Sequence, residues 1–216
     1  KTALDRIERM LVANHANGVF FDFEDIPPAA QRDYLAFLGE ARARFAARDW
    51  LIAIAVPVGD SSWNLKAYSR IVDRLFVMAY DEHYQQGAPG PIASLPWVMD
   101  QVNRAVRGID RSKIVIAIAN YAYDWENGAK GPTKALSVEE AWLEARDSSS
   151  QPSFDPASGN SRFDYDERGV HHEVWYADAV TAYNQIKALH NAGYHQLALW
   201  RLGTEDPSLW GLFGHH

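Results

Sequence analysis

Short apolar segments alternate with segments of helical period along the chain. The apolar segments have the length of β-strands and carry charge only near their ends, as is typical of parallel strands buried on both faces. They cover residues 17–24, 51–57, 74–81, 113–120 and 196–200. Between them, apolar residues recur every three or four positions, which predicts amphipathic helices. Because strand and helix alternate five times, the pattern predicts an α/β fold on a parallel sheet.

Local signals indicate where the helices begin and end. Pro27-Pro28 is typical of a helix start, Ser94 is a plausible cap, and Gly193 is typical of a helix end. Ser137 and Glu140 have the spacing of a capping box. The expected helices cover residues 3–14, 28–45, 63–73, 96–106, 137–145 and 178–192.

The strand and helix rhythm is interrupted once, after the fourth strand. A polar segment over 147–160 is followed by two apolar stretches, 163–165 and 170–176, that flank Glu-Arg-Gly. Such a pair around a turn predicts a β-hairpin. Together with the helix from Ser137, it predicts a small α+β insertion over residues 136–177.

Polar and aromatic residues collect where the expected strands end. In parallel sheets and barrels the active sites lie at the carboxyl ends of the strands. Four ends carry such residues: Asp22 and Glu24, Tyr80 and Asp81, Tyr121 and Tyr123, and Trp200. This coincidence predicts a functional site at that edge of the sheet.

Asp22 and Glu24 are the first of these pairs. If the strand continues through them, alternation puts Phe20, Asp22 and Glu24 on one face. Two neighbouring carboxylates that repel each other and lose water would keep one proton near neutrality, which is how a general acid is made. The alternative is a surface strand end with both acids solvated.

Composition narrows the class of protein. With 216 residues, 47% hydrophobic and 23% charged, the chain suits a single globular domain. The net charge of −7 argues against nucleic acid as a partner. Without cysteine, neither disulfides nor a thiolate zinc site can form. The 8 Trp, 10 Tyr and 9 Phe suit sugar binding or ordinary packing. No H-x-H or H-x-x-x-H pair occurs, so no metal is expected.

Three motifs in order resemble glycoside hydrolase family 18, the chitinase-type (β/α)8 barrels. Residues 17–24 resemble the D-G-x-x-x-D-x-E motif at Gly18, Asp22 and Glu24, and residues 78–81 match M-x-Y-D. Trp200 matches the tryptophan that ends strand eight. Residues 80–83, 121–125 and 199–207 further resemble a bacterial branch with spore-cortex hydrolase-like domains and family-18-like domains fused to polysaccharide deacetylase or glycosyltransferase modules.

The resemblance implies a retaining, substrate-assisted hydrolysis of glycans with β-linked N-acetylglucosamine, without a cofactor. It gives Glu24 the role of proton donor, because the acetamido oxygen of the sugar itself attacks the anomeric carbon. Asp22 would orient the acetamido group and Tyr80 would hydrogen-bond its carbonyl oxygen, with Asp81 beside them. The implied sugar contacts are Trp200, Tyr121, Tyr123, Trp125 and Glu82. An extracytoplasmic location is expected for such an enzyme.

The sequence departs from the family in two ways. Asn17 replaces the first aspartate of the motif, and Phe20 stands where the family usually places Asp or Asn beside Asp22. This predicts altered or low activity. The five strands correspond to strands four to eight, so the barrel is expected to be incomplete, with a missing N-terminal segment or a second chain supplying the remaining wall.

The catalytic region is expected over residues 1–213, and Gly214-His215-His216 is interpreted as a tag remnant. Two other functions remain open. One is a glycan-binding domain that has lost its chemistry, which the Phe20 departure and the missing strands favour. The other is a metal-dependent barrel enzyme with Asp22, Glu24 and Asp81 as ligands.

Overall fold

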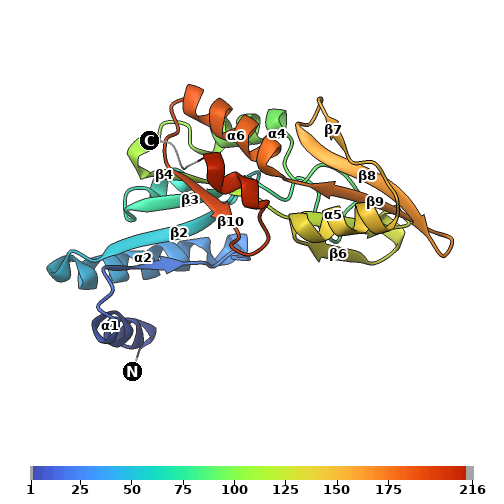
Figure 1. Cartoon of the computed structure of the whole chain (residues 1–216). Helices are drawn as coiled ribbons and strands as arrows, with labels where there is room; N and C mark the ends of the chain where they lie inside the picture. The colour runs from blue at the N-terminus through green and yellow to red at the C-terminus, as the bar shows by residue number, and fades with distance from the viewer. Residues whose placement is uncertain (1, 213–216) are drawn as a thin grey trace. The chain divides into compact units, whose positions relative to one another are not determined.

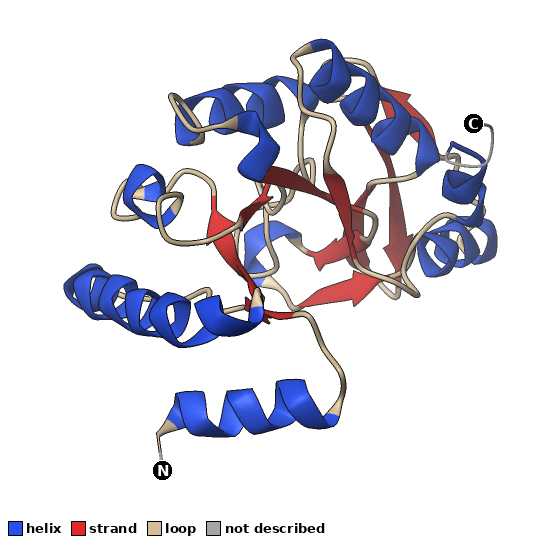
Figure 2. Ribbon diagram, turned by 90° about the vertical axis from the view of Figure 1, so that its left-hand side faces the viewer, coloured by secondary structure: helices blue, strands red, loops and turns tan. Residues whose placement is uncertain are grey.

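The computed structural model describes residues 2–212, which form two compact units. Unit 1 contains residues 2–78 and 103–116, and unit 2 contains residues 79–102 and 117–212. Both units combine helices with strands, and Figure 2 colours these two kinds of element separately. The proposed tag, Gly214-His215-His216, lies outside the described residues.

Unit 1 is built on parallel strands. β1 (Gly18–Phe21), β2 (Leu51–Pro57) and β3 (Arg74–Met78) follow one another, and both pairs are parallel. The first residues of β4 (Ile114–Ala119) belong to this unit and come next in the strand order. The helices of the unit are α1 (Ala3–Ala13), α2 (Gln31–Phe45) and α3 (Leu65–Tyr68). Strands, helices and their order confirm the expected α/β class.

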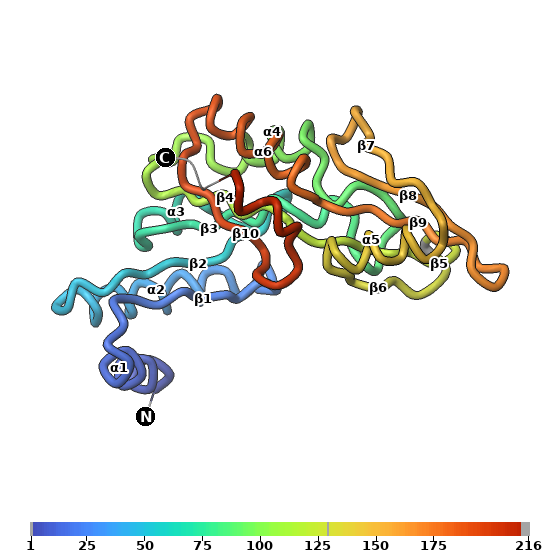
Figure 3. Tube along the Cα trace, viewed as in Figure 1, coloured from blue at the N-terminus to red at the C-terminus, as the bar shows by residue number. Residues whose placement is uncertain are grey.

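Helix α2 covers one face of β1 and β2 (Figures 1 and 3). Its buried residues follow the helical period: Tyr34, Leu38, Ala41 and Phe45. They meet an apolar sheet whose Ile52, Ile54 and Val56 are fully buried. Removal of this apolar surface from water is the main term that stabilises the layer.

Gly18 begins β1 because no larger residue fits there. A Cβ atom at this position would lie 2.4 Å from the carbonyl oxygen of Leu51, on the neighbouring strand. The glycine of the sequence motif therefore allows the backbones of β1 and β2 to approach.

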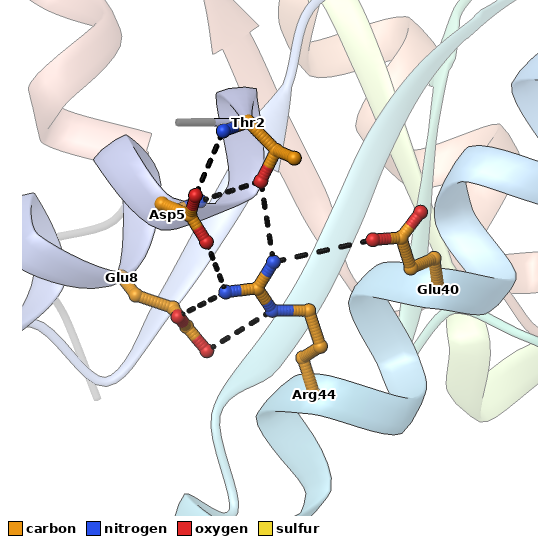
Figure 4. A network of polar contacts seen from close by, with 5 residues as sticks. All are labelled: Thr2, Asp5, Glu8, Glu40 and Arg44. Carbon is orange, nitrogen blue, oxygen red and sulfur yellow. Dashed lines mark hydrogen bonds and ion pairs between the residues drawn. The ribbon is translucent and has the colours of Figure 1, made fainter.

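An arginine cluster joins α1 to α2 (Figure 4). The Arg44 guanidinium donates to Asp5 at 2.8 Å and to Glu8 at 2.5 Å, and it lies 4.0 Å from Glu40. Thr2 and Asp5 also form the capping box that begins α1. The hydrogen bond from Arg44 is the main reason that the pKa of Asp5 is lowered.

Several elements are shorter than their sequence patterns predicted. β1 ends at Phe21 and β3 ends at Met78, so the residues that follow them are loop residues. The helix expected over 63–73 is the single turn α3. In each case the pattern of the sequence continued beyond the residues that form sheet or helix hydrogen bonds in the structure.

Unit 2 contains the second half of β4, which β10 (Leu197–Trp200) follows in the strand order. Helix α6 (Ala179–Asn191) precedes β10, and α4 (Leu95–Ala105) lies in this unit as far as Val102. Unit 2 also contains an antiparallel sheet with the order β6-β5-β9-β8-β7, the α-helix α5 and the short 3-10 helices η4 (Gly128–Lys130) and η5 (Pro207–Leu212). The strands and α5 have the bounds β5 (Ala122–Glu126), β6 (Thr133–Leu136), α5 (Val138–Asp147), β7 (Ser153–Asp155), β8 (Asn160–Glu167) and β9 (Val170–Tyr176).

The hairpin β8–β9 is longer than the sequence pattern predicted (Figure 3). Its pairs run from Ser161–Tyr176 to Glu167–Val170, so the turn is Arg168-Gly169. Gly169 has a φ of +80°, which the tight turn requires. The antiparallel sheet also includes β5 and β6, which begin before residue 136, where the insertion was expected to start.

The antiparallel sheet is buried on both faces. One face packs on α5 through Ala122, Phe163, Val174 and other apolar residues. The opposite face carries Tyr123, Trp125 and Trp175, which pack with Ile92, Ala119 and Tyr121. Strand alternation therefore sends consecutive residues of β5 to two different environments.

Candidate functional site

In unit 1, Asp22 and Glu24 lie in an irregular segment directly after β1. Both side chains are exposed. The expectation that they lie on a strand and lose water there is therefore wrong for the chain as described. Phe20, the residue that departs from the family motif, is 46% exposed, and its ring lies 4.9 Å from that of Phe76.

Aromatic contacts hold this segment against α2. The Phe23 ring lies 5.9 Å from Phe21 and 5.7 Å from Tyr34, so the apolar residues on both sides of Asp22 face the helix. The Tyr34 hydroxyl is buried without a hydrogen-bond partner among the described residues. Burial raises the pKa of Tyr34, and the charges of Tyr68 and Asp22 add to this effect.

A glutamine completes the support of the segment. Gln31 donates from Nε2 to the carbonyl oxygen of Ile26 at 3.0 Å, and its Oε1 accepts a 2.6 Å hydrogen bond from the Tyr68 hydroxyl. The loop that carries both carboxylates is therefore tied to α2 and α3 by side chains, although it has no regular structure of its own.

Unit 2 contains a pocket of about 210 Å³. Four residues expected at strand ends line it, and six further residues complete it. The lining residues are Asp81, Tyr121, Tyr123, Ala135, Leu136, Ser137, Glu140, Trp200, Arg201 and Thr204. The lining combines aromatic side chains with a few polar groups, as small-molecule sites commonly do.

Asp81 is the polar centre of the pocket. Its Oδ1 accepts hydrogen bonds from the Tyr121 hydroxyl at 2.5 Å and the Tyr123 hydroxyl at 3.1 Å. The surrounding protein removes part of its hydration and raises its pKa, while both tyrosine hydrogen bonds act in the opposite direction. Asp81 has a φ of +61°, a left-handed conformation that is uncommon outside glycine. Such backbone strain is frequent at functional sites.

Tyr80 and Trp200 form an aromatic pair next to Asp81. Their rings are stacked at 6.5 Å with an interplanar angle of 16°, and Tyr80 also meets the edge of Tyr121 at 6.3 Å. Trp200 is 42% exposed, so part of its indole face is open to a ligand. Its carbonyl oxygen accepts the backbone N–H of Asn120, which ties the end of β10 to the end of β4.

Two residues expected to contact sugar have other environments. Trp125 is completely buried, because it points into the core between the antiparallel sheet and the segment around Ile92. The Glu82 carboxylate accepts the backbone N–H of Ser94 at 2.6 Å and does not line the pocket. Trp125 therefore presents no surface to a ligand, whereas Glu82 is half-buried and its carboxylate is engaged by the backbone of Ser94.

The loop after β10 and the start of α5 contribute pocket residues that the sequence pattern did not indicate. The spacing of Ser137 and Glu140 predicts a capping box, which the structure confirms. Arg201 and Thr204 follow Trp200 directly, so their position after a strand end was an available signal. The Thr204 hydroxyl lies 3.2 Å from the Asn120 side-chain oxygen and 3.0 Å from the Arg201 carbonyl oxygen.

No group of at least three His, Asp or Glu side chains in residues 2–212 could hold a metal ion. No helix in the same part of the chain is long and apolar enough to cross a membrane.

Comparison with known proteins places this geometry in a family. Residues 1–205 match the family model "Glycosyl hydrolases family 18". The chain is 28% identical over 206 residues to the "Cortical fragment-lytic enzyme" of Bacillus anthracis, covering 90% of this chain and 48% of that protein. It is also 28% identical over 231 residues to the "Uncharacterized glycosylase YvbX" of Bacillus subtilis strain 168, with coverage of 97% and 65%.

Solved structures agree with these sequence matches. The Bacillus cereus spore cortex-lytic enzyme SleL aligns with a TM-score of 0.89 and 26% identity, covering 97% of this chain and 50% of that one. A chitinase from Chromobacterium violaceum shares the fold, with a TM-score of 0.88 at 23% identity and coverage of 99% and 71%. The chain thus spans about half the length of the cortical fragment-lytic enzyme that it matches. Because the family match covers nearly the whole sequence, the chain belongs to glycoside hydrolase family 18.

Proposed function

We propose that this chain is the catalytic part of a glycosidase that cleaves polysaccharides containing β-linked N-acetylglucosamine. The main support is the pocket of unit 2. In it, Asp81 accepts hydrogen bonds from two tyrosine hydroxyls, and the partly exposed indole of Trp200 also lines the pocket. The family membership supports the reaction class. The relatives named above include a cortical fragment-lytic enzyme, a spore cortex-lytic enzyme and a chitinase, so chitin-like chains, peptidoglycan and related exopolysaccharides are the candidate substrates.

The pocket residues suit an N-acetylated sugar. The indole of Trp200 offers a flat apolar surface on which the C–H face of a pyranose ring can stack. Tyr80 would donate from its hydroxyl to the acetamido carbonyl oxygen. Asp81, fixed by Tyr121 and Tyr123, would stabilise positive charge as it develops on the sugar.

Glu24 and Asp22 would move and guide the proton. In the proposed step, the Glu24 carboxyl gives its proton to the glycosidic oxygen, and the bond between that oxygen and the anomeric carbon breaks. The acetamido oxygen forms a bond to the same carbon, and Asp22 holds the acetamido N–H. Water then opens the resulting oxazolinium ion and returns a proton to Glu24, so the configuration is retained.

The exposure of Glu24 sets a condition on this mechanism. A glycan lying over the segment would exclude water from this carboxyl group, so we propose that the environment a general acid needs forms only when substrate binds. A cell-envelope glycan as substrate would also place the protein outside the cytoplasm, which remains part of the proposal.

A glycan-binding domain without activity is the second candidate. Phe20 favours it, because a phenyl ring cannot share a proton or a hydrogen bond with Asp22 as a carboxylate or amide would. This candidate predicts calorimetric binding of oligosaccharides and no product from the unmodified protein.

The test is hydrolysis of acetylated and de-acetylated glucosamine oligomers, followed by mass spectrometry. We expect cleavage of acetylated chains alone, because only they carry the participating oxygen. Glu24→Gln should reduce turnover at least a hundredfold, the usual scale for loss of a general acid, while binding persists. Asp25→Asn removes a neighbouring exposed acid and serves as the matched control. Equal hydrolysis by wild type and Glu24→Gln would exclude the proposed acid.

A further inference from the structure

A buried carboxylate that the proposed mechanism does not use lies behind the pocket. Asp124 belongs to β5 and has 0% of its surface exposed. A buried carboxylate is costly unless its oxygens are hydrogen-bonded. Its partners therefore indicate what the residue does.

Asp124 is hydrogen-bonded from two neighbouring strands. Nδ1 of His172, on β9, lies 2.9 Å from its Oδ1 and 3.1 Å from its Oδ2. The Tyr165 hydroxyl, on β8, donates to Oδ2 at 3.0 Å. The Tyr165 and His172 rings stack at 4.3 Å with an angle of 16°, which fixes both partners of the carboxylate.

Charged groups surround this cluster on the same face. Lys134 of β6 approaches Asp124 Oδ2 at 3.9 Å and Glu126 at 3.6 Å. Burial raises the pKa of Tyr165, and the charges of Asp124, Glu144 and Glu167 raise it further. Asp124 thus makes polar contacts with β6, β8 and β9 from its own strand β5.

The opposite face of β5 contributes Tyr123 to the pocket. Tyr123 directly precedes Asp124 and pairs with Trp175, while Asp124 pairs with Val174. Tyr123 and Tyr121 both donate to Asp81. A slip of one residue in β5 would exchange its two faces, so whatever fixes the register also fixes the tyrosine hydroxyls.

We propose that Asp124 is a positioning residue for the pocket. Its carboxylate, held by Tyr165 and His172, locks the register of β5 so that Tyr121 and Tyr123 reach Asp81. The inference deepens the proposed function, and its catalytic consequence rests on that function. Its structural consequence can be tested without any hydrolysis.

The direct test is a titration of the Asp81 carboxyl group by carbon-13 NMR. The Asp81→Asn variant assigns the signal, and Tyr121→Phe shows how far it moves when one hydrogen bond is lost. In Asp124→Asn we expect Asp81 to titrate at higher pH than in wild type. The reason is that the tyrosine hydrogen bonds, which stabilise the ionised carboxylate, become longer or break.

Controls separate positioning from general loss of stability. Asp164→Asn removes an exposed acid of β8 that is bound to Arg162, and it should leave the Asp81 titration unchanged. Tyr165→Phe removes one of the donors to Asp124 and should give a smaller shift in the same direction. If Asp124→Asn fails to fold, as judged by circular dichroism, Tyr165→Phe and His172→Gln carry the test.

The kinetic readout follows from the same displacement. At temperatures where Asp124→Asn is folded, kcat should fall about tenfold with little change in KM, since small misplacement of catalytic groups has effects of this order. An unchanged Asp81 titration in the folded variants would overturn the proposal, even if their melting temperatures fall. If wild type shows no hydrolysis, the proposed function fails, while the titration still decides the role of Asp124.

Discussion

Asp81 shows how one residue can be held between two opposing influences. Loss of hydration raises its pKa, and the hydroxyls of Tyr121 and Tyr123 lower it by stabilising the anion. The two tyrosines in turn have raised pKa values, mainly because they are buried, so they remain donors over the whole physiological range. Loss of either tyrosine hydroxyl should therefore raise the pKa of Asp81 further.

Trp200 is the residue whose contribution to binding is easiest to isolate. Its exposed indole face offers apolar contact to a sugar, and Trp200→Ala removes this contact without removing a proton donor. We expect KM to rise about tenfold, the effect of losing roughly 1.4 kcal/mol of contact, with a smaller change in kcat. Phe154→Ala removes another exposed aromatic ring of unit 2 and should leave KM unchanged. Steady-state kinetics on an acetylated oligomer would decide, and equal KM values would exclude Trp200 as a platform.

Sequence position predicted some of the site residues better than others. Asp81, Tyr121, Tyr123 and Trp200 were expected at strand ends, and all four line one pocket. Trp125 lies on the same face of β5 as Tyr123, but it is two residues further along the strand. There the core residues around Ile92 cover it completely. The Glu82 carboxylate bonds to a loop N–H, a contact that depends on tertiary folding and leaves no pattern in the sequence.

At the scale of elements, the end of β1 explains the main error in the predicted strands. Alternation continues through Phe23, whose ring remains on the side of Phe21. Pairing stops at Phe21, and the segment leads into Pro27-Pro28, which lack the backbone N–H that a ladder requires. The alternation of side chains therefore continues further along the chain than the hydrogen bonds between strands. Only the alternation is visible in the sequence, so the strand was predicted too long.

The Arg44 cluster predicts how α1 depends on salt and pH. Arg44→Met retains the aliphatic stem but removes the hydrogen bonds to Asp5 and Glu8, so the melting temperature should fall in low salt. The difference from wild type should shrink in high salt, which screens partly exposed pairs. Arg6→Met changes an exposed arginine of α1 and is the matched control. Calorimetric melting at several salt concentrations provides the measurement.

Low pH should remove the difference in melting temperature between wild type and Arg44→Met. The pKa of Asp5 is lowered in the folded chain, so its stabilising effect is fully present above the ordinary pKa of aspartate. It is lost as pH falls through the lowered folded value, where Asp5 takes up a proton. The melting temperatures of wild type and Arg44→Met should therefore converge at low pH. A difference that persists in strong acid would contradict this role of the ion pairs.

At the scale of the molecule, the alternation of strand and helix was sufficient to predict the fold class, while the resemblance to the family rested on three motifs at strand ends. Each apolar run and amphipathic stripe records its own burial, so the order of elements can be read locally. The sequence does not show in the same way which partner surface covers an exposed apolar group. The chain covers 71% of the Chromobacterium violaceum chitinase and 48% of the Bacillus anthracis lytic enzyme, so the other parts of those proteins have no counterpart in this sequence.

The surface near β10 has an unusually apolar character. A hollow of about 330 Å³ is lined entirely by apolar residues: Ile118, Ile186, Leu197, Ala198, Leu199, Leu202 and Trp210. Leu202 is 76% exposed, and β10 is the last strand in the described sheet order. Open strand edges and exposed apolar groups favour association between chains.

We therefore expect residues 1–216 to self-associate in a concentration-dependent way. Leu202→Glu, combined with Trp210→Glu, should reduce this association, because burying the new charges in an interface would be costly. Leu143→Glu places the same charge on an exposed position of α5 and should have no such effect. Sedimentation velocity at rising protein concentration distinguishes these variants. A wild-type chain that stays monomeric throughout would show that the apolar hollow does not need a cover, and that a second chain has no part in completing this sheet.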